Sequence, residues 1–228
     1  MTKSTITTPY DAFIFDLDGV IVDTAKYHFL AWKRLAGELG ITLEDSDEES
    51  LKGVSRLESL DIILSKGTVE IDDAEKEALA TKKNNWYLEY IEGVDSSDLL
   101  PGTGEFLKEL KDQGLKIGLA SSSKNAKPVL NKLNITEYFD VIIDGTMIKN
   151  TKPDPEIFNL CAELLCTAKD RCIVFEDAVS GVEASKAAGI DTIGIGEPEV
   201  LNKADLVVSS LADINLKKIS TFAAPKSA

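Results

Sequence analysis

Apolar runs of strand length alternate with stretches of helical periodicity along most of the chain. The runs lie at residues 12–15, 116–120, 141–143, 172–175, 192–195 and 206–208. Apolar side chains at helical spacing occur at 103–113, 126–133 and 180–188, and Pro155 suits the first turn of another helix. Because strands that alternate with helices form parallel sheets, the sequence predicts a doubly wound, Rossmann-like α/β fold.

The stretch from Thr24 to about residue 97 interrupts this alternation. Helical patterns cover 25–39, 57–66 and 72–91, with no convincing strand among them. Thr24 is suited to cap the first of these helices and Gly40 to end it. The stretch is far longer than an ordinary crossover between two strands. We therefore expect residues 1–23 and 98–228 to form the α/β core and residues 24–97 to form an inserted helical cap domain.

Two carboxylates follow the first apolar run. Asp16 and Asp18 are separated by one residue, so on an extended chain both can project toward one cleft. Two like charges this close raise each other's pKa unless a cation or hydrogen-bond donors compensate. Mg²⁺ meets that need and suits phosphate chemistry, and a carboxylate can also be a covalent nucleophile. The alternative is a solvated acidic loop without a function.

Polar residues recur where the later strands end. Ser121 follows the second strand, Lys152 follows the third after a loop, and Glu176 and Asp177 follow the fourth. Ligands of open α/β sheets bind beyond the carboxyl ends of the strands. Each residue alone has a simpler explanation, as a helix cap or a surface lysine. Their recurrence at strand ends favours a phosphoryl-transfer site.

The order of these residues resembles the four motifs of the haloacid dehalogenase superfamily. Asp16-Leu17-Asp18 resembles the first motif, Ser121 the second, Lys152 in Lys-Pro-Asp-Pro the third, and Glu176-Asp177 the fourth. The resemblance implies that Asp16 accepts the phosphoryl group and that Asp18 is the acid and base. It also implies a Mg²⁺ ion held by Asp16, the carbonyl of Asp18, Asp177 and Glu176, with Ser121 and Lys152 binding phosphate oxygens.

The inserted stretch is similar to the helical cap of sugar-phosphate mutases in this superfamily, through residues 23–32, 51–56 and 83–84, and residues 121–125 of the core also fit these mutases. The similarity implies interconversion of β-D-glucose 1-phosphate and glucose 6-phosphate through an aspartyl phosphate and glucose 1,6-bisphosphate. Thr24 and His28 would complete the catalytic set. The candidate substrate contacts are Trp32, Lys52, Gly53, Val54, Ser55, Arg56, Ser59, Lys83, Asn84, Ser121, Ser122, Ser123, Lys124, Asn125 and Lys152. Without the resemblance, His28 and Trp32 would be structural and Lys52 and Arg56 surface charges.

Composition limits the possible partners. A net charge of −14 and an isoelectric point near 4.6 argue against nucleic acid or an anionic membrane as partner, and require any phosphate site to be locally positive. Cys161, Cys166 and Cys172 form no Cys-x-x-Cys pair, which indicates free thiols in a reducing compartment. We expect a cytoplasmic monomer that acts on small sugar phosphates, without a signal peptide or membrane span. The polar residues 1–9 and the short, weakly patterned tail 223–228 are expected to be mobile.

Two other functions remain open from the sequence. One is a phosphatase of the same superfamily that acts on a small sugar or polyol phosphate. The other is a regulatory module that accepts a phosphate without turnover. Asp18 disfavours the second, because a simple phosphate acceptor needs no acid beside its nucleophile.

Overall fold

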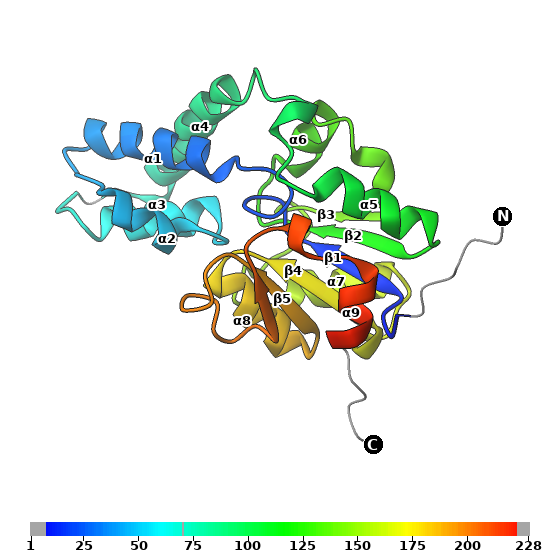
Figure 1. Cartoon of the computed structure of the whole chain (residues 1–228). Helices are drawn as coiled ribbons and strands as arrows, with labels where there is room; N and C mark the ends of the chain where they lie inside the picture. Colours follow the sequence, from blue (N-terminus) through cyan, green and yellow to red (C-terminus); the bar gives the residue numbers. More distant parts are fainter. Residues whose placement is uncertain (1–7, 70, 223–228) are drawn as a thin grey trace.

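The computed structural model describes residues 8–69 and 71–222, which form an α/β core with a group of helices to one side of it (Figure 1). The ends predicted to be mobile fall largely in residues 1–7 and 223–228, outside the described ranges. Within those ranges, no helix is both long enough and apolar enough to cross a membrane.

In the described part of the chain, six parallel strands form one sheet in the order β3-β2-β1-β4-β5-β6. β1 therefore lies inside the sheet, between β2 and β4. Every residue of β1 and β4 is buried, as expected of strands covered by helices on both faces. The bounds are β1 Ala12–Phe15, β2 Lys116–Ala120, β3 Val141–Ile143, β4 Cys172–Glu176, β5 Asp191–Ile195 and β6 Leu206–Val208. The predicted doubly wound fold is confirmed.

Helices cover both faces of this sheet. One face packs against α5 (Thr103–Asp112), α6 (Ala126–Lys132) and α9 (Leu216–Phe222), and the other against α7 (Glu156–Leu164) and α8 (Val179–Ala188) (Figure 1). Side chains of β1 alternate between the two layers. Phe15 stacks on Phe175 at 4.7 Å and meets Phe106 of α5 edge to face, whereas Ile14 belongs to the cluster that contains Phe158 of α7.

Between β1 and α5, the described residues form four α-helices to one side of the core: α1 (Ala25–Glu38), α2 (Glu48–Leu51), α3 (Arg56–Leu64) and α4 (Asp73–Tyr90). Ser55 and Asp72 begin α3 and α4, each in a reciprocal capping box with the glutamate three residues later. Gly40 follows α1 with a φ of +71°, in agreement with its predicted role. α1 packs on α4, and Trp32, Leu35 and Tyr87 join one hydrophobic cluster with Phe13 and Phe15 of the sheet.

The chain enters and leaves this helical group at one place. Val22, on the way out, forms an antiparallel bridge with Leu99, on the way back. The adjacent Leu100 N–H donates to the Ile21 carbonyl at 2.9 Å. Two neighbouring crossings are typical of a domain inserted into another, and they support our proposal that residues 24–97 form a separate cap domain.

The remaining helical structure was only partly predicted. The acidic residues between α1 and α3, where no helix was predicted, contain a 3₁₀ turn (Asp45–Asp47) and α2. The pattern predicted over 72–91 is one continuous helix, α4, and the polar run 82–85 lies inside it. The helix α9 was not predicted. Further 3₁₀ turns are Ser96–Asp98, Thr136–Tyr138, Lys169–Arg171 and Leu211–Asp213.

Candidate active site

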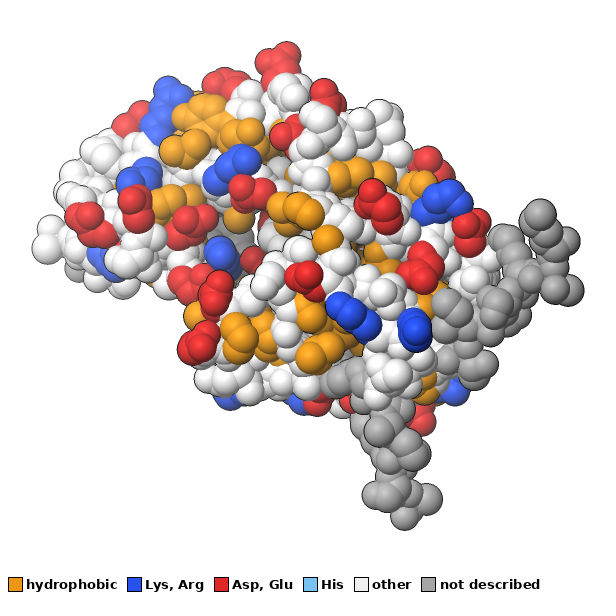
Figure 2. All heavy atoms as spheres, in the orientation of Figure 1, with side chains coloured by type: hydrophobic (Ala, Val, Ile, Leu, Met, Phe, Trp, Pro, Cys, Tyr) orange, Lys and Arg blue, Asp and Glu red, His pale blue; other side chains and the backbone are white. Residues whose placement is uncertain are grey.

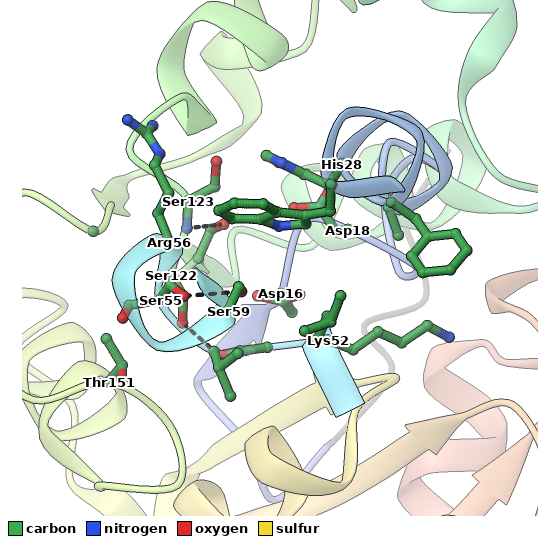
Figure 3. A pocket seen from close by; sticks show the side chains of 18 of the residues that line it. Asp16, Asp18, His28, Lys52, Ser55, Arg56, Ser59, Ser122, Ser123 and Thr151 are labelled. Atoms are coloured by element: carbon green, nitrogen blue, oxygen red, sulfur yellow. Dashed lines mark hydrogen bonds between the residues drawn. The ribbon is translucent and has the colours of Figure 1, made fainter. Parts of the chain in front are cut away.

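A cavity of about 110 Å³ lies between the carboxyl ends of the strands and the four cap helices (Figure 3). Asp16 and Asp18 of the core line it, and Ser55 and Arg56 at the start of α3 line it from the cap side. The predicted site residues that line it are Asp16, Asp18, His28, Trp32, Lys52, Gly53, Val54, Ser55, Arg56, Ser59, Lys83, Ser121, Ser122, Ser123, Lys124 and Asp177. The structure therefore brings together residues from widely separated parts of the chain.

Lys152 lies behind the nucleophile candidate. Its side chain is fully buried, and its ammonium donates to Asp16 at 2.7 Å, to the Ala120 carbonyl at 3.1 Å and to Glu176. Burial alone would lower the pKa of Lys152, but the carboxylates of Asp16 and Glu176 raise it above its ordinary value. This lysine therefore stays charged and orients the Asp16 carboxylate.

Three carboxylates meet beside this lysine. Asp16, Glu176 and Asp177 each offer one oxygen, and these oxygens lie within 4.8 Å of one another. Burial raises the pKa of Glu176 to about 7 against the opposing effect of Lys152. Burial, followed by the nearby Glu176 and Asp16, raises the pKa of Asp177 well above its usual value. A close group of oxygen ligands whose charges are costly to bury fits a hard divalent cation.

Gly19 makes room for one of these ligands. It has a φ of +78°, and a Cβ atom built on it would lie 2.0 Å from an Asp177 carboxylate oxygen. Only glycine satisfies both the backbone angle and the close approach of this carboxylate.

Asp18 stands apart from the metal-binding group, so its predicted metal contact would come from its backbone carbonyl. The Thr24 hydroxyl donates to the Asp18 carboxylate. Thr24 occupies the N-cap position of α1 as predicted, but its side chain makes no capping hydrogen bond, because its hydroxyl is used by Asp18. Burial, followed by the nearby Asp16, raises the pKa of Asp18 to about 7, a value suited to an acid and base near neutral pH.

His28 belongs to a compact cluster on the cap side. Its ring stacks parallel on Tyr87 with centroids 3.7 Å apart, and its Nδ1 lies 2.6 Å from the Lys83 ammonium. Lys83 also lies over the Trp32 ring at 4.5 Å. Burial lowers the pKa of His28, and Lys83 and Arg56 lower it further. The imidazole is therefore neutral, and Nδ1 accepts a hydrogen bond from Lys83.

Arg56 is held in place from the core as well as from the cap. It donates to the Asn84 side-chain oxygen at 2.7 Å, and the same oxygen accepts from Asn125 of the core at 2.8 Å. Asn84 and Asn125 do not line the cavity and support Arg56 from behind, as Thr24 supports Asp18 and Lys152 supports Asp16. Glu176 lies behind the cavity too, as part of the metal-binding group.

The local positive charge that a phosphate site requires comes from residues largely hidden from the surface. Figure 2 shows acidic and basic side chains mixed over the visible face, without a broad basic area. Lys83 is 1 % exposed and Lys152 0 % exposed. Burial, followed by the nearby Arg56, lowers the pKa of Lys83 well below its usual value, and Lys152 is paired with Asp16 and Glu176. The cations of the site are therefore set inside an acidic protein and not on its surface.

Sequence reasoning missed several neighbours of the site. Thr151, Glu48 and Phe29 line the cavity, and Tyr87 stacks on His28. Tyr87 follows Lys83 by four residues on α4, so helical spacing could have predicted that both side chains lie on the same face of the helix. Thr151 directly precedes Lys152, but nothing in its local pattern indicates a cavity-lining side chain.

The fold and the site define a class of protein. A sequence profile of the haloacid dehalogenase-like hydrolases matches residues 13–195. The chain therefore belongs to the haloacid dehalogenase-like hydrolase family.

Individual members of this family are similar to the chain over most of its length. A β-phosphoglucomutase of Bacillus subtilis is 45% identical over 208 residues, which cover 90% of this chain and 92% of that protein. The crystal structure of β-phosphoglucomutase from Clostridium difficile superposes with a TM-score of 0.90 at 45% identity, covering 93% of this chain and 96% of the other. A phosphorylated carbohydrates phosphatase of Thermotoga maritima is 36% identical over 80% of this chain and 83% of its own length. The chain is thus a homologue of β-phosphoglucomutases and, more distantly, of a carbohydrate phosphatase.

Proposed function

We propose that the chain is a Mg²⁺-dependent β-phosphoglucomutase that interconverts β-D-glucose 1-phosphate and glucose 6-phosphate. The observation that carries this proposal is the two-sided cavity, which has Asp16 and Asp18 on the core side and Arg56 on the cap side. Such a cavity can hold one phosphate at the reacting centre and a second one at the far end. The similarity to two β-phosphoglucomutases at 45% identity supports this pair of substrates.

In the proposed reaction, a carboxylate oxygen of Asp16 attacks phosphorus and forms an aspartyl phosphate. The contact from Lys152 fixes the direction of the Asp16 carboxylate and leaves a positive charge beside the transferring group. We assign a phosphate oxygen to the hydroxyl of Ser121, which follows β2 and lines the cavity. Phospho-Asp16 passes its phosphoryl group to the 6-hydroxyl of β-D-glucose 1-phosphate and gives glucose 1,6-bisphosphate. The bisphosphate then returns its 1-phosphoryl group to Asp16 and leaves as glucose 6-phosphate.

Asp18 supplies and removes the proton. It protonates the leaving sugar oxygen in one direction and takes the proton from the attacking hydroxyl in the other. Thr24 holds one carboxylate oxygen of Asp18, so the other can face the sugar. His28, fixed by Tyr87 and Lys83, adds a neutral hydrogen-bonding group on the cap side.

The carboxylates of Asp16, Glu176 and Asp177 and the carbonyl of Asp18 would hold Mg²⁺. The ion would neutralise charge on the phosphoryl oxygens. The remaining substrate contacts are assigned to Lys52, Gly53, Val54, Ser55 and Ser59 of the cap and to Ser123 and Lys124 of the core, all of which line the cavity.

The second candidate is a phosphatase, favoured by the similarity to the Thermotoga enzyme at 36% identity. The two activities share the aspartyl phosphate and differ in whether sugar or water accepts the phosphoryl group. Cavity-lining residues from the cap favour sugar, because a closed cap excludes water from the phospho-enzyme.

One experiment separates these functions. Phosphorylated enzyme is prepared with Mg²⁺ and its decay is followed with and without β-D-glucose 1-phosphate, while phosphorus NMR identifies the products. A mutase discharges much faster onto the sugar phosphate and yields glucose 1,6-bisphosphate and glucose 6-phosphate. Equal decay rates, with inorganic phosphate as the sole product, would establish the phosphatase instead. Monomeric state and cytoplasmic location stay predictions, to be checked by sedimentation and cell fractionation.

A further inference from the structure

Three hydroxyl groups of the core donate hydrogen bonds to one short segment of the cap, residues 52–58. The Ser122 hydroxyl, after β2, donates to the Gly53 carbonyl at 2.9 Å. The Ser180 hydroxyl, on α8, donates to the Lys52 carbonyl at 3.3 Å. The Thr151 hydroxyl, in the loop before α7, donates to the Glu58 carboxylate. Three separate core elements therefore hold the same piece of chain.

The contact is tight at its centre. Gly53 has a φ of +72°, and a Cβ atom there would lie 2.4 Å from the Ser180 hydroxyl oxygen and 3.2 Å from Ala178 Cβ. A side chain at this position would push the segment away from α8. The cap backbone at Gly53 is therefore in direct contact with the start of α8 in the core.

The segment held in this way carries the groups assigned to the distal phosphate. Arg56 begins α3 directly after Ser55, and Ser55 shares a capping box with Glu58. The Glu58 oxygen that accepts from Thr151 also accepts from the Ser55 backbone N–H at 2.9 Å. A hydroxyl of the core thus acts, through Glu58, on the turn that presents Arg56 to the cavity (Figure 3).

We propose that Ser122, Thr151 and Ser180 are positioning residues that hold segment 52–58 over the phospho-enzyme, so that the phosphoryl group reaches sugar and not water. This inference rests on the proposed mutase function, and it assigns the Ser122 hydroxyl to the cap backbone and not to the sugar. When the cap opens, these hydrogen bonds break, and each hydroxyl and its acceptor form hydrogen bonds with water instead. A net contribution of about 0.5–1.5 kcal/mol per hydrogen bond corresponds to roughly 2- to 13-fold in the ratio of closed to open protein.

The test removes two of the hydroxyls in the full chain, as Ser122→Ala with Ser180→Ala. The matched control is Ser65→Ala, because the exposed Ser65 donates to Ile62 within the cap and contacts no core residue through that hydroxyl. The first measurement is amide hydrogen exchange of residues 52–58 without substrate. We expect exchange to rise roughly 5- to 160-fold in the double variant and to stay unchanged in the control, with the unfolding midpoint of both variants close to that of the parent. Unchanged exchange in the double variant would overturn the proposal.

The second measurement is the partition of the phospho-enzyme between β-D-glucose 1-phosphate and water. We expect the fraction lost to water to rise by a similar factor in the double variant. Thr151→Val, which keeps the shape of threonine, should act in the same direction, and Thr151→Ser should not. Faster exchange with an unchanged partition would overturn the link to water exclusion. If the parent enzyme never transfers to sugar, the proposed function fails, whereas the exchange result still tests the contacts of Ser122 and Ser180.

Discussion

Replacement of Lys152 by methionine should be among the most destabilising single changes that the site permits. Lys152 and Glu176 are 0 % exposed, and Asp16 is buried beside them. Methionine has nearly the length of the lysine side chain, so the packing is largely kept while the positive charge is removed. What remains is two buried carboxylates without a cation between them.

The magnitude follows from this burial. Removal of one partner from a buried ion pair typically reduces the free energy of unfolding by about 3–5 kcal/mol, because the other charge is left uncompensated. We expect a loss in this range at pH 8 without Mg²⁺, and partial recovery in saturating Mg²⁺, which replaces the missing positive charge. Lys108→Met is the control, because Lys108 pairs with Asp112 on the surface and should leave stability nearly unchanged.

Denaturant unfolding across a range of pH measures the effect. Glu176 has its pKa raised from 4.5 to about 7 in the folded protein, so the folded state binds this proton more tightly than the unfolded chain. The stability from this group is therefore fully present below about pH 4.5 and is lost as the pH rises through 7. Loss of Lys152 raises that pKa further, so the destabilisation should shrink in acid and be partly relieved by Glu176→Gln. A loss below about 1 kcal/mol at pH 8, or one that Glu176→Gln does not reduce, would refute the reasoning.

Four further predictions concern the reaction. Asp16→Asn should keep the fold and abolish both turnover and phospho-enzyme trapping; normal turnover by protein shown by mass spectrometry not to have deamidated would contradict it. Chelation should stop catalysis, Mg²⁺ should restore it and Ca²⁺ should restore it poorly, whereas full activity in excess chelator would exclude the metal site. Arg56→Ala should slow the steps that hold a second phosphate by roughly 10- to 100-fold while phospho-enzyme formation from a small phosphoryl donor changes little. Gly19→Ala should displace Asp177, so calorimetry should find weaker Mg²⁺ binding than in a Gly93→Ala control, where a Cβ atom meets no neighbour.

The strands and the order of the core motifs could be predicted from the sequence for a clear reason. β1 and β4 are buried on both faces, so their sequences are continuous apolar runs. Because the two strands are parallel neighbours, their carboxyl ends lie at the same edge of the sheet. The carboxylates that follow Phe15 and Phe175 must therefore lie close together at that edge of the sheet. The helix α9 escaped prediction because its few apolar positions, Leu216 and Ile219, are too short a pattern to indicate a helix.

Other features depend on contacts that local pattern does not encode. Threonine is a residue type favoured at helix N-caps, yet the Thr24 hydroxyl donates its hydrogen bond to Asp18. Lys83 lies in a polar run that suggests exposure, but His28 and Trp32 surround it once α1 and α4 pack together. The contact of Ser122 with Gly53 joins the core to the cap, and it requires the whole chain to be folded.

The bridge between Val22 and Leu99 has a consequence for how such a protein can change over evolution. Because the chain leaves the sheet and returns to it at adjacent points, a different insertion can be accommodated there without moving β1 or the carboxylates behind it. The catalytic residues at the strand ends and the substrate-selecting residues of the insertion between residues 23 and 98 can then change independently of each other. The limit on such exchange is the shared hydrophobic cluster, since any replacement must still cover the apolar side chains of Val20 and Ile21.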